Sequence, residues 1–436
     1  MRKLSMFLVI FGLLSWFILS CDEEKSDGAD TETVGDKEIE IFSWWTSGGE
    51  AEALQALIDA FTAQFPGVNA VNVSAESADG QAARAALDLR MENNNPPDTF
   101  QLGPRDFQNW IEYKGNPADN RLEPLDSLFA SEGWLTAYPP GVLEVLKYNG
   151  SFYAVPVNMH RQNTLMYNMA LVPTPPTTWA EFMTLAESLH AQNIVPLAVS
   201  AEAGWTLEII FFSIMAASQG STYHNAFFTG ALDMTDAVNL AKFEAALADY
   251  QTLMSYANAD AGDLGWDAAA ALIKEGSAAM YIHGDWAKGY LESLAWTPGV
   301  DFGVMAVPGS QDEFIYNVDT FALCKGAKHR QNALNFLRVI GGPTAQEAFN
   351  KLKGSTPVHS DVNVSTWDVA AKSTVADYSN ATILHNVEIH QFSVVDATAA
   401  DGATSLGDKL FELSSGVITE AELVTWVTTN YTLATN

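Results

Sequence analysis

Cysteine and basic side chains are scarce in this sequence. Only two cysteines, Cys21 and Cys324, occur in 436 residues, so a scaffold held together by disulfides is excluded. Lys and Arg number 22 against 53 Asp and Glu, which gives a formal net charge of -31 at pH 7. A negative excess of this size repels the phosphates of nucleic acids and the surfaces of anionic membranes, so polyanions are poor candidate partners and no nucleic-acid ligand is expected.

The sequence motifs of several enzyme classes are also missing. The patterns HExxH, GxSxG, CxxC, GxxxxGKS/T and GxGxxG do not occur, so zinc protease, esterase, redox and nucleotide-binding functions have no support. Residues 258–263 resemble a calcium-binding loop, but Ala269 stands at the position that should supply a bidentate carboxylate. We therefore expect no metal site and no cofactor.

The composition is that of a packed globular protein. Hydrophobic residues make up 48% of the chain and charged residues 17%. A chain of this length usually forms two or three domains with a sizeable core. Cys324 lies in an apolar run and is expected to be a small buried hydrophobe.

The first residues have the order of a secretory signal. Arg2 and Lys3 precede an apolar run at residues 6–19, which is too short for a comfortable membrane span. The run ends in Leu19-Ser20-Cys21, which resembles the lipobox of bacterial lipoproteins. This resemblance implies a signal peptide at residues 1–20 and an acylated Cys21 that anchors the protein to a membrane, in the periplasm or at the cell surface. An ordinary signal peptide with an accidental cysteine, or a buried amphipathic helix, is the alternative.

Residues 21–37 predict a solvated tether, because they are acidic, rich in small residues and free of aromatics. The folded body then begins with alternating strands and helices. Residues 38–41 alternate with period two, residues 50–65 have a helical apolar face, and a strand, helix and strand follow near residues 71–74, 81–91 and 99–102. This order predicts an α/β fold with a mostly parallel sheet.

Two later segments carry clear helix signals. Thr178 and Glu181 form a capping box that predicts a helix start. Residues 331–340 predict an amphipathic helix closed by Gly341 and Gly342, with Pro343 placed to begin the next helix.

Several separated motifs resemble one family, the extracellular solute-binding proteins (family 1) of sugar ABC transporters. Tyr167-Asn168 is followed by Pro175-Pro176, Thr178-Trp179 and Glu181-Phe182, and a second block pairs residues 276–280 with Gly284-Asp285-Trp286. Residues 95–98 and 325–336 match as well, so the resemblance covers nearly all of residues 38–436. Residues 44–50 (WWTSGGE) and 157–161 (VNMHR) look most like the glucose/mannose-binding branch.

The resemblance implies a two-lobe periplasmic-binding-protein fold of type II, in which each lobe is a mostly parallel sheet flanked by helices. The chain would cross between the lobes three times, with hinges near residues 154–156, 314–319 and 350–355. Residues 38–155 and 319–352 would form the N-terminal lobe. Residues 156–318 and 353–436 would form the C-terminal lobe.

The same resemblance implies a sugar site between the lobes. A hexose has flat C–H faces and a rim of hydroxyls, so a site needs aromatic plates together with polar donors and acceptors. Trp44 and Trp45 lie where a strand leads into a helix, the edge at which open α/β sheets bind ligands. The full set of expected ligand-binding residues is Trp44, Trp45, Glu50, His160, Trp266, Trp286, Asp319, Lys353 and His385.

Alternatives stay open for several of these residues. One indole of the adjacent pair at positions 44 and 45 could belong to the core, because neighbours on a strand face opposite ways. Lys353 could be a solvated charge, His385 a hydrogen-bonded histidine, and His160 a tie between the lobes. Where relatives offer a polar residue near the end of the third strand, this chain leaves Gln101 or Arg105 to serve.

We therefore predict a binding lipoprotein of an ABC sugar importer, not an enzyme. It would act as a monomer, capture a monosaccharide, with glucose or mannose expected, and deliver it to the transmembrane permease subunits and their ATPase. The rival hypothesis is an extracytoplasmic glycoside hydrolase that uses Glu50 and Asp319 as its carboxylate pair.

Overall fold

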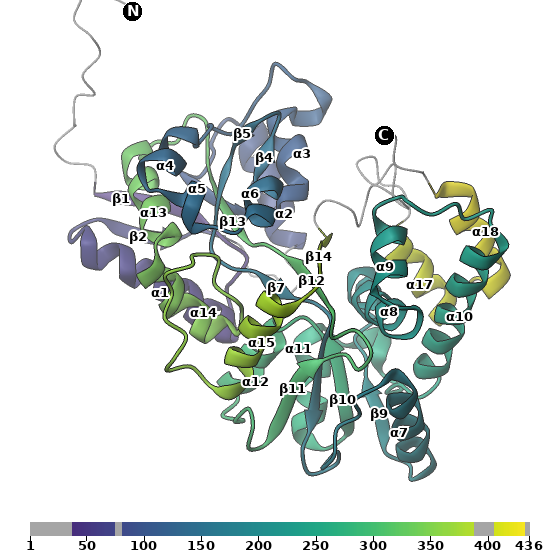
Figure 1. The fold of residues 1–436 in the computed structure, drawn as a ribbon. Helices are drawn as coiled ribbons and strands as arrows, with labels where there is room; N and C mark the ends of the chain where they lie inside the picture. The colour runs from purple at the N-terminus through teal and green to yellow at the C-terminus, as the bar shows by residue number, and fades with distance from the viewer. Residues whose placement is uncertain (1–36, 75–80, 388–404, 432–436) are drawn as a thin grey trace, which may run out of the picture. The chain divides into compact units, whose positions relative to one another are not determined.

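The computed structural model describes residues 37–74, 81–387 and 405–431. The predicted signal peptide, Cys21 and nearly all of the predicted tether lie outside these residues. The described chain contains two α/β lobes, each with its own sheet and hydrophobic core (Figure 1). A smaller, three-stranded sheet is separate from both. The two-lobe α/β fold predicted from the sequence is confirmed.

The sheet of the first lobe has five strands in the order β2-β1-β3-β13-β6. Its strands are β1 (Glu38–Phe42), β2 (Asn69–Asn72), β3 (Thr99–Leu102), β6 (Ala154–Pro156) and β13 (Thr320–Leu323). β1 runs parallel to β2 and β3, whereas β13 runs antiparallel to both β3 and β6. The sheet is therefore mixed and not mostly parallel as predicted, because β13 follows β12 without a helical crossover to reverse its direction.

Helices α1 and α13 pack against this sheet and against each other. α1 buries Leu54, Leu57, Ile58 and Phe61 on the face that the apolar spacing predicted. The helices of this lobe are α1 (Gly48–Gln64), α2 (Gln81–Glu92), α3 (Phe107–Ile111), α4 (Asp126–Ser131), α5 (Trp134–Ala137), α6 (Pro140–Val145), α13 (Arg330–Gly341) and α14 (Pro343–Lys353). Short 3-10 turns at Pro104–Asp106 and Tyr113–Gly115 and a hairpin of β4 (Lys147–Tyr148) and β5 (Ser151–Phe152) complete the lobe.

The sheet of the second lobe has four strands in the order β11-β8-β10-β9. Its strands are β8 (Thr164–Asn168), β9 (Val195–Ala198), β10 (Ala278–His283) and β11 (Phe302–Ala306). β9 and β10 are parallel, because the long helical segment between them carries the chain back to the same edge, and β8 is antiparallel to β10 and β11. This sheet too is mixed.

Helices make up most of the second lobe. The capping box predicted at the start of α7 is confirmed, since the Glu181 amide donates to the Thr178 hydroxyl over 3.2 Å. α8 is buried almost all round and packs against α9, α10 and α17. The helices of this lobe are α7 (Trp179–Ala191), α8 (Gly204–Gln219), α9 (Ser221–Phe228), α10 (Ala237–Met254), α11 (Trp266–Glu275), α12 (Trp286–Ser293), α17 (Leu406–Ser414) and α18 (Glu420–Asn430), with a 3-10 turn at Ala261–Asp263.

A three-stranded sheet joins the two lobes. Its order is β14-β12-β7, with β7 (His160–Arg161), β12 (Glu313–Asn317) and β14 (Ile383–Asn386), and α15 (Val369–Asn380) precedes β14. Three segments of the chain connect the lobes beside this sheet, and they contain residues 157–159, residue 319 and residue 356. Val157 donates its amide to the carbonyl of Asp319 over 3.0 Å, and Met159 and Thr356 exchange two backbone hydrogen bonds. These connections lie close to the predicted hinges, and both the hinges and the lobe boundaries stay a prediction.

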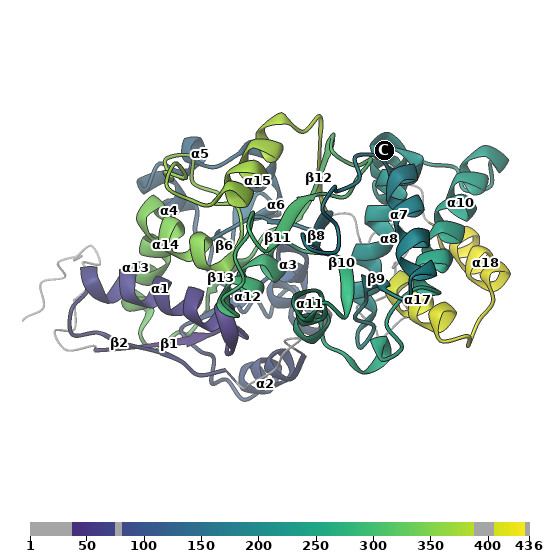
Figure 2. The ribbon, with the colours of Figure 1, turned by 90° about the horizontal axis from the view of Figure 1, so that it is seen from below.

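The helices α1, α12 and α14 lie close together (Figure 2), and glycines occupy their points of contact. A Cβ added at Gly289 of α12 would lie 2.7 Å from the carbonyl oxygens of Leu352 and Lys353. A Cβ at Gly49 of α1 would lie 3.1 Å from the Gly289 carbonyl oxygen. Backbone therefore packs on backbone at this junction, and a side chain there would force the helices apart.

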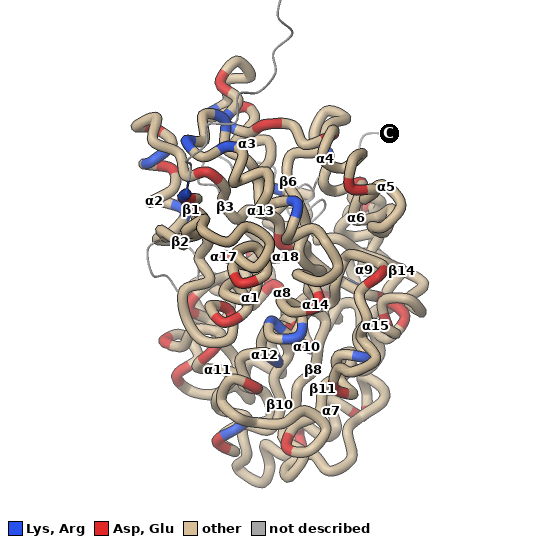
Figure 3. The backbone as a smooth tube through the Cα atoms, turned by 90° about the vertical axis from the view of Figure 1, so that its left-hand side faces the viewer, with Lys and Arg blue, Asp and Glu red and all other residues tan. Residues whose placement is uncertain are grey.

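Two further features concern the chain as a whole. Among the described residues, no helix combines the length and the apolar content that a membrane crossing requires. Acidic residues are spread over many elements (Figure 3), and Cys324 is fully buried as expected.

Substituting Gly289 by Ala is expected to lower the free energy of unfolding by about 1–3 kcal/mol, because overpacking outweighs the better helix propensity of Ala. Urea denaturation would measure the change. Gly262→Ala is the matched control, since nothing lies within 4 Å of the added Cβ, and its stability should stay within about 0.5 kcal/mol of wild type. Equal midpoints for all three proteins would contradict the proposed close packing.

Candidate functional site

A cavity of about 170 Å³ lies between elements of the two lobes. All the sequence-predicted binding residues except His385 line it: Trp44, Trp45, Glu50, His160, Trp266, Trp286, Asp319 and Lys353. They come from the turn between β1 and α1, from α1, from β7, from the turn between β12 and β13, and from α11, α12 and α14. The cavity therefore gathers segments that lie far apart in the sequence.

The paired indoles of Trp44 and Trp45 differ in their surroundings. Trp45 is 2% exposed, with its ring 5.1 Å from that of Phe349, yet it also borders the cavity. Trp44 is partly buried, and the guanidinium of Arg84 lies 4.7 Å from its ring centroid. The question left open by the sequence is thus settled in part, since one indole belongs to the core and both face the cavity.

Gln101 and Arg105 take separate roles. Gln101 on β3 is buried, and its amide, oriented to donate to Ser43, accepts hydrogen bonds from both indole N–H groups at 3.3 and 3.2 Å. This glutamine therefore fixes the orientation of the two rings from behind. Arg105 lies in the turn after β3 and lines the cavity.

The second lobe supplies an aromatic wall. The ring of Trp286 lies 5.0 Å from that of His160 and 6.2 Å from that of Trp205, and Trp266 packs near His283 behind it. Trp205 lines the cavity but was missed in the sequence analysis. It lies in the first turn of α8, the helix that follows β9. This is the same kind of strand-to-helix position that identified Trp44 and Trp45, and this signal could have found it.

Buried His283 supports this wall without facing the cavity. Its side chain is 1% exposed, and burial lowers the pKa of the imidazole to about 3. The ring therefore stays neutral at neutral pH and packs as an aromatic plate between Trp205, Trp266 and Trp286.

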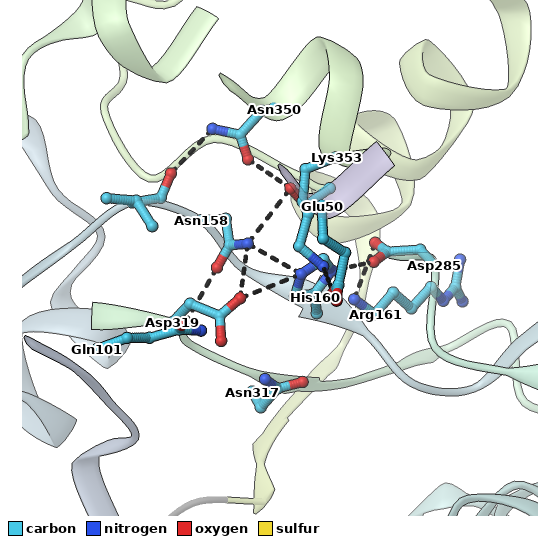
Figure 4. A network of polar contacts seen from close by, with 12 residues as sticks. Glu50, Gln101, Asn158, His160, Arg161, Asp285, Asn317, Asp319, Asn350 and Lys353 are labelled. Atoms are coloured by element: carbon cyan, nitrogen blue, oxygen red, sulfur yellow. Dashed lines mark hydrogen bonds and ion pairs between the residues drawn. The ribbon is translucent and has the colours of Figure 1, made fainter. Parts of the chain in front are cut away.

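Polar groups from both lobes converge on His160 at the floor of the cavity (Figure 4). Its Nδ1 contacts the carboxylate of Asp285, which precedes α12, and its Nε2 lies 3.2 Å from Asp319 Oδ2. Asn158 donates from its side chain to the same Asp319 oxygen over 2.9 Å and accepts from the Asp319 amide over 3.0 Å. One carboxylate of this network thus belongs to the second lobe and the other to a connection into the first.

A second ion pair borders the same cavity. Lys353, at the end of α14, donates to Glu50 of α1 over 2.6 Å, and its ammonium lies 5.4 Å from the centroid of Trp45. The Lys353 side chain is 3% exposed, so it is not the solvated charge that the sequence left possible. Asn317 and Gln162 add amide groups to the lining.

Charge in the network shifts two pKa values. Burial and the Lys353 ammonium lower the pKa of His160, but Asp285 and Asp319 together outweigh them, so the pKa lies above its usual value of 6.5. For Asp319, burial raises the pKa, but the hydrogen bond and charge of His160 together with Lys353 bring it below the usual value of 3.8. The floor of the cavity therefore pairs a carboxyl group whose pKa is lowered with an imidazole whose pKa is raised.

The structure does not bring His385 to the cavity. It lies on β14, is 2% exposed, and places its Nδ1 3.0 Å from Asn225 Oδ1 of α9. Because β14 is the edge strand that packs against α9, this side chain turns toward the helix and away from the lining. The expected ligand-binding role of His385 is therefore not supported by its position.

The elevated pKa of His160 predicts a pH-dependent stability. Folding favours the protonated ring, so this stabilisation is complete below pH 6.5 and is lost as the pH rises through the folded pKa. The difference in unfolding free energy between wild type and His160→Gln should shrink as the pH rises above 6.5. Denaturant titrations at several pH values would measure it, with substitution of the exposed His190 by Gln as a comparison variant. Parallel profiles for wild type and His160→Gln would refute the raised pKa.

Comparison with known proteins identifies the family. The sequence profile of "Bacterial extracellular solute-binding protein" matches residues 45–347. A probable sugar-binding periplasmic protein of Brucella melitensis is 31% identical over 349 residues, which cover 79% of this chain and 80% of that protein. The xylose/arabinose-binding protein XacG of Haloferax volcanii is 26% identical over 399 residues, covering 87% of this chain and 82% of the relative.

A solved structure shows the same fold. The bacterial solute receptor AcbH, described with an exclusive substrate preference for β-D-galactopyranose, superimposes with a TM-score of 0.72 at 18% identity, and the match covers 91% of this chain and 98% of that one. The profile match covers most of the chain, and the two-lobe architecture is the one seen in the solved structure. This chain belongs to the family of bacterial extracellular solute-binding proteins.

Proposed function

We propose that this protein is the substrate-binding component of a sugar ABC importer and that its ligand is a monosaccharide, with glucose or mannose expected. The observation that carries the proposal is the cavity in which indole rings and charged groups from both lobes meet. Indoles supply flat apolar area for the C–H faces of a sugar, and carboxylates and cations supply partners for its hydroxyls. The side chains that line the cavity are therefore suited both to the C–H faces and to the hydroxyl rim of a hexose.

The size of the cavity supports a single sugar ring. Its volume of about 170 Å³ is well below the roughly 300–1,000 Å³ of pockets that take drug-sized ligands. Among its relatives, XacG is named for two pentoses, and AcbH is described as preferring one hexose. For a ligand of about a dozen heavy atoms, micromolar affinity, about 8 kcal/mol, is within reach.

The proposed roles follow the position of each group. Trp44 and Trp286 are the plates for the sugar faces, since both are partly exposed in the cavity. Asp319 is an acceptor for hydroxyls, because His160 and Asn158 hold its carboxylate in place. Glu50, Arg105 and Lys353 fix the remaining hydroxyls at the rim, with Trp45 and Trp266 completing the walls.

Delivery would use a change between open and closed forms. The three connections beside the third sheet are the segments about which the lobes move. A sugar that contacts both lobes binds the closed form better and so shifts the population toward it. The membrane permease, powered by its ATPase, would recognise the surface of the closed form.

The rival hypothesis of a glycoside hydrolase has less support. Such enzymes need one carboxylic acid that stays protonated by a raised pKa. The pKa of Asp319 is lowered, and Glu50 accepts from Lys353 over 2.6 Å. Neither carboxyl group has the surroundings of a general acid.

Replacing Trp286 by Ala is expected to weaken monosaccharide binding by about 30-fold to 1,000-fold, since truncating an aromatic contact of this kind removes about 2–4 kcal/mol. Asp319→Asn should weaken it by at least about tenfold through loss of a charged acceptor. Isothermal titration calorimetry with D-glucose and D-mannose would measure both, and circular dichroism would check the fold.

Trp426→Ala is the matched control, because Trp426 lies on α18, is partly buried and does not line the cavity. Its affinity should equal that of wild type. Near-native affinity in both site variants would defeat the site assignment. Release of reducing sugar from oligosaccharides, in excess of the protein concentration, would instead establish the hydrolase.

We also propose that Cys21 is acylated and holds the protein at a membrane, outside the cytoplasm. Cys21→Ser should then move the protein from the membrane pellet to the soluble fraction and remove a lipid-sized mass increment. Fractionation and intact-mass spectrometry in a bacterial host would measure this. Cys324→Ser is the control that should stay in the pellet, and an unchanged distribution of Cys21→Ser would refute the anchor.

A further inference from the structure

Three ionisable side chains meet in the interior, away from the sugar cavity. His224 lies on α9, Glu313 on β12 and His385 on β14, and one possible ligand atom from each lies within 4.8 Å of the other two. The three side chains are 0%, 0% and 2% exposed. None of them lines the cavity described above. The cluster therefore calls for an explanation of its own.

The hydrogen bonds of this cluster are incomplete. His224 Nδ1 lies 2.8 Å from Glu313 Oε1, so the carboxylate accepts from that nitrogen. Within the described part of the chain, His224 Nε2 and Glu313 Oε2 are fully buried and have no hydrogen-bond partner. Fully buried polar atoms are nearly always paired, and a carboxylate left half-paired in the interior is costly.

Protonation alone does not resolve the deficit. If His224 is neutral, its Nε2 lone pair is unsatisfied, and if it is an imidazolium, its Nε2 hydrogen is unsatisfied instead. Glu313 Oε2 lacks a partner in both cases. A cation bound by these two atoms satisfies both at once and also neutralises the buried carboxylate.

His385 presents the third nitrogen. Its Nδ1 lies 3.0 Å from Asn225 Oδ1, and an amide oxygen only accepts, so Nδ1 carries the hydrogen. In the neutral ring Nε2 then holds the lone pair. An imidazole whose other nitrogen donates to a protein oxygen is the usual arrangement of a metal ligand.

We propose that His224, Glu313 and His385 form a binding site for a divalent transition-metal cation of the zinc class. Two imidazole nitrogens and one carboxylate are a ligand set that suits Zn²⁺ and not the all-oxygen preference of Ca²⁺ or Mg²⁺. The three residues of the site lie far apart in the sequence, so no local spacing of residues could have predicted it.

The position of the site assigns it a structural role. Glu313 begins β12, the strand that continues to Asn317 in the lining and then to Asp319. His385 lies on the neighbouring strand β14, paired in register with Ile315. Metal bound here ties helix α9 of the second lobe to the sheet that carries the connections between the lobes.

The first test is metal content and stability of the untagged protein. The protein is treated with chelator, incubated with Zn²⁺ and passed through gel filtration. Inductively coupled plasma mass spectrometry should then find about one zinc ion per chain. Zn²⁺ should raise the melting temperature by at least about 2 °C. Glu313→Gln and His385→Gln should retain less than a tenth of the wild-type zinc, whereas exposed His190→Gln should retain all of it.

The second test needs no substitution, which matters if the variants do not fold. Co²⁺ added to the metal-free wild type should give visible absorption bands of a tetrahedral or five-coordinate ion with nitrogen and oxygen ligands, and Zn²⁺ should abolish them. Absence of both the bands and retained zinc would overturn the proposal. Zinc retained equally by Glu313→Gln would overturn it as well. Both tests are made without sugar, so their outcome is independent of the proposed transport function.

Discussion

The side chain of His160 connects the two lobes through polar contacts with two carboxylates. Its ring lies between Asp285 of the second lobe and Asp319 of the connection that leads into the first. Each of these charges is largely buried, and a buried charge is tolerable only with a partner of opposite sign and with hydrogen bonds to its remaining atoms. The network of His160, Asn158 and Asp319 meets that condition, and it fixes the floor of the cavity. The indole rings that form the walls of the cavity are therefore placed relative to a fixed floor.

The walls themselves arise from a repeated local pattern. Trp44 and Trp45 follow β1 before α1, Trp205 follows β9 at the start of α8, and Trp286 follows β10 at the start of α12. In each case a strand ends, the chain turns, and a helix begins, so the indole is carried at the edge where the sheet stops. Two unrelated sheets with this pattern, facing each other across short connections, produce a gap lined by aromatic rings.

The sequence predicted much of this site and missed parts of it for identifiable reasons. Strand-to-helix positions and family motifs located Trp44, Trp286, Asp319 and Lys353, because these signals are local. The sheets were predicted to be mostly parallel but are mixed, since strand pairing depends on the path of the chain between the lobes and not on the residues of each strand. His385 was assigned to the sugar for its motif, but its direction depends on α9, which no local pattern reveals. The partner of a buried side chain is a tertiary property, and residues such as Asn225 and Glu313 become informative only when the fold is known.

The place of β13 in the first sheet bears on how the chain folds. β13 comprises residues 320–323, yet it lies between β3 and β6, which both end before residue 157. The sheet therefore cannot close until the whole second-lobe sheet has been synthesised, and until then β3 and β6 expose unpaired edges. A nascent chain in this condition needs protection from aggregation from the synthesis of β6 until that of β13, and it suits an export route that keeps the polypeptide unfolded until its last strands have crossed the membrane.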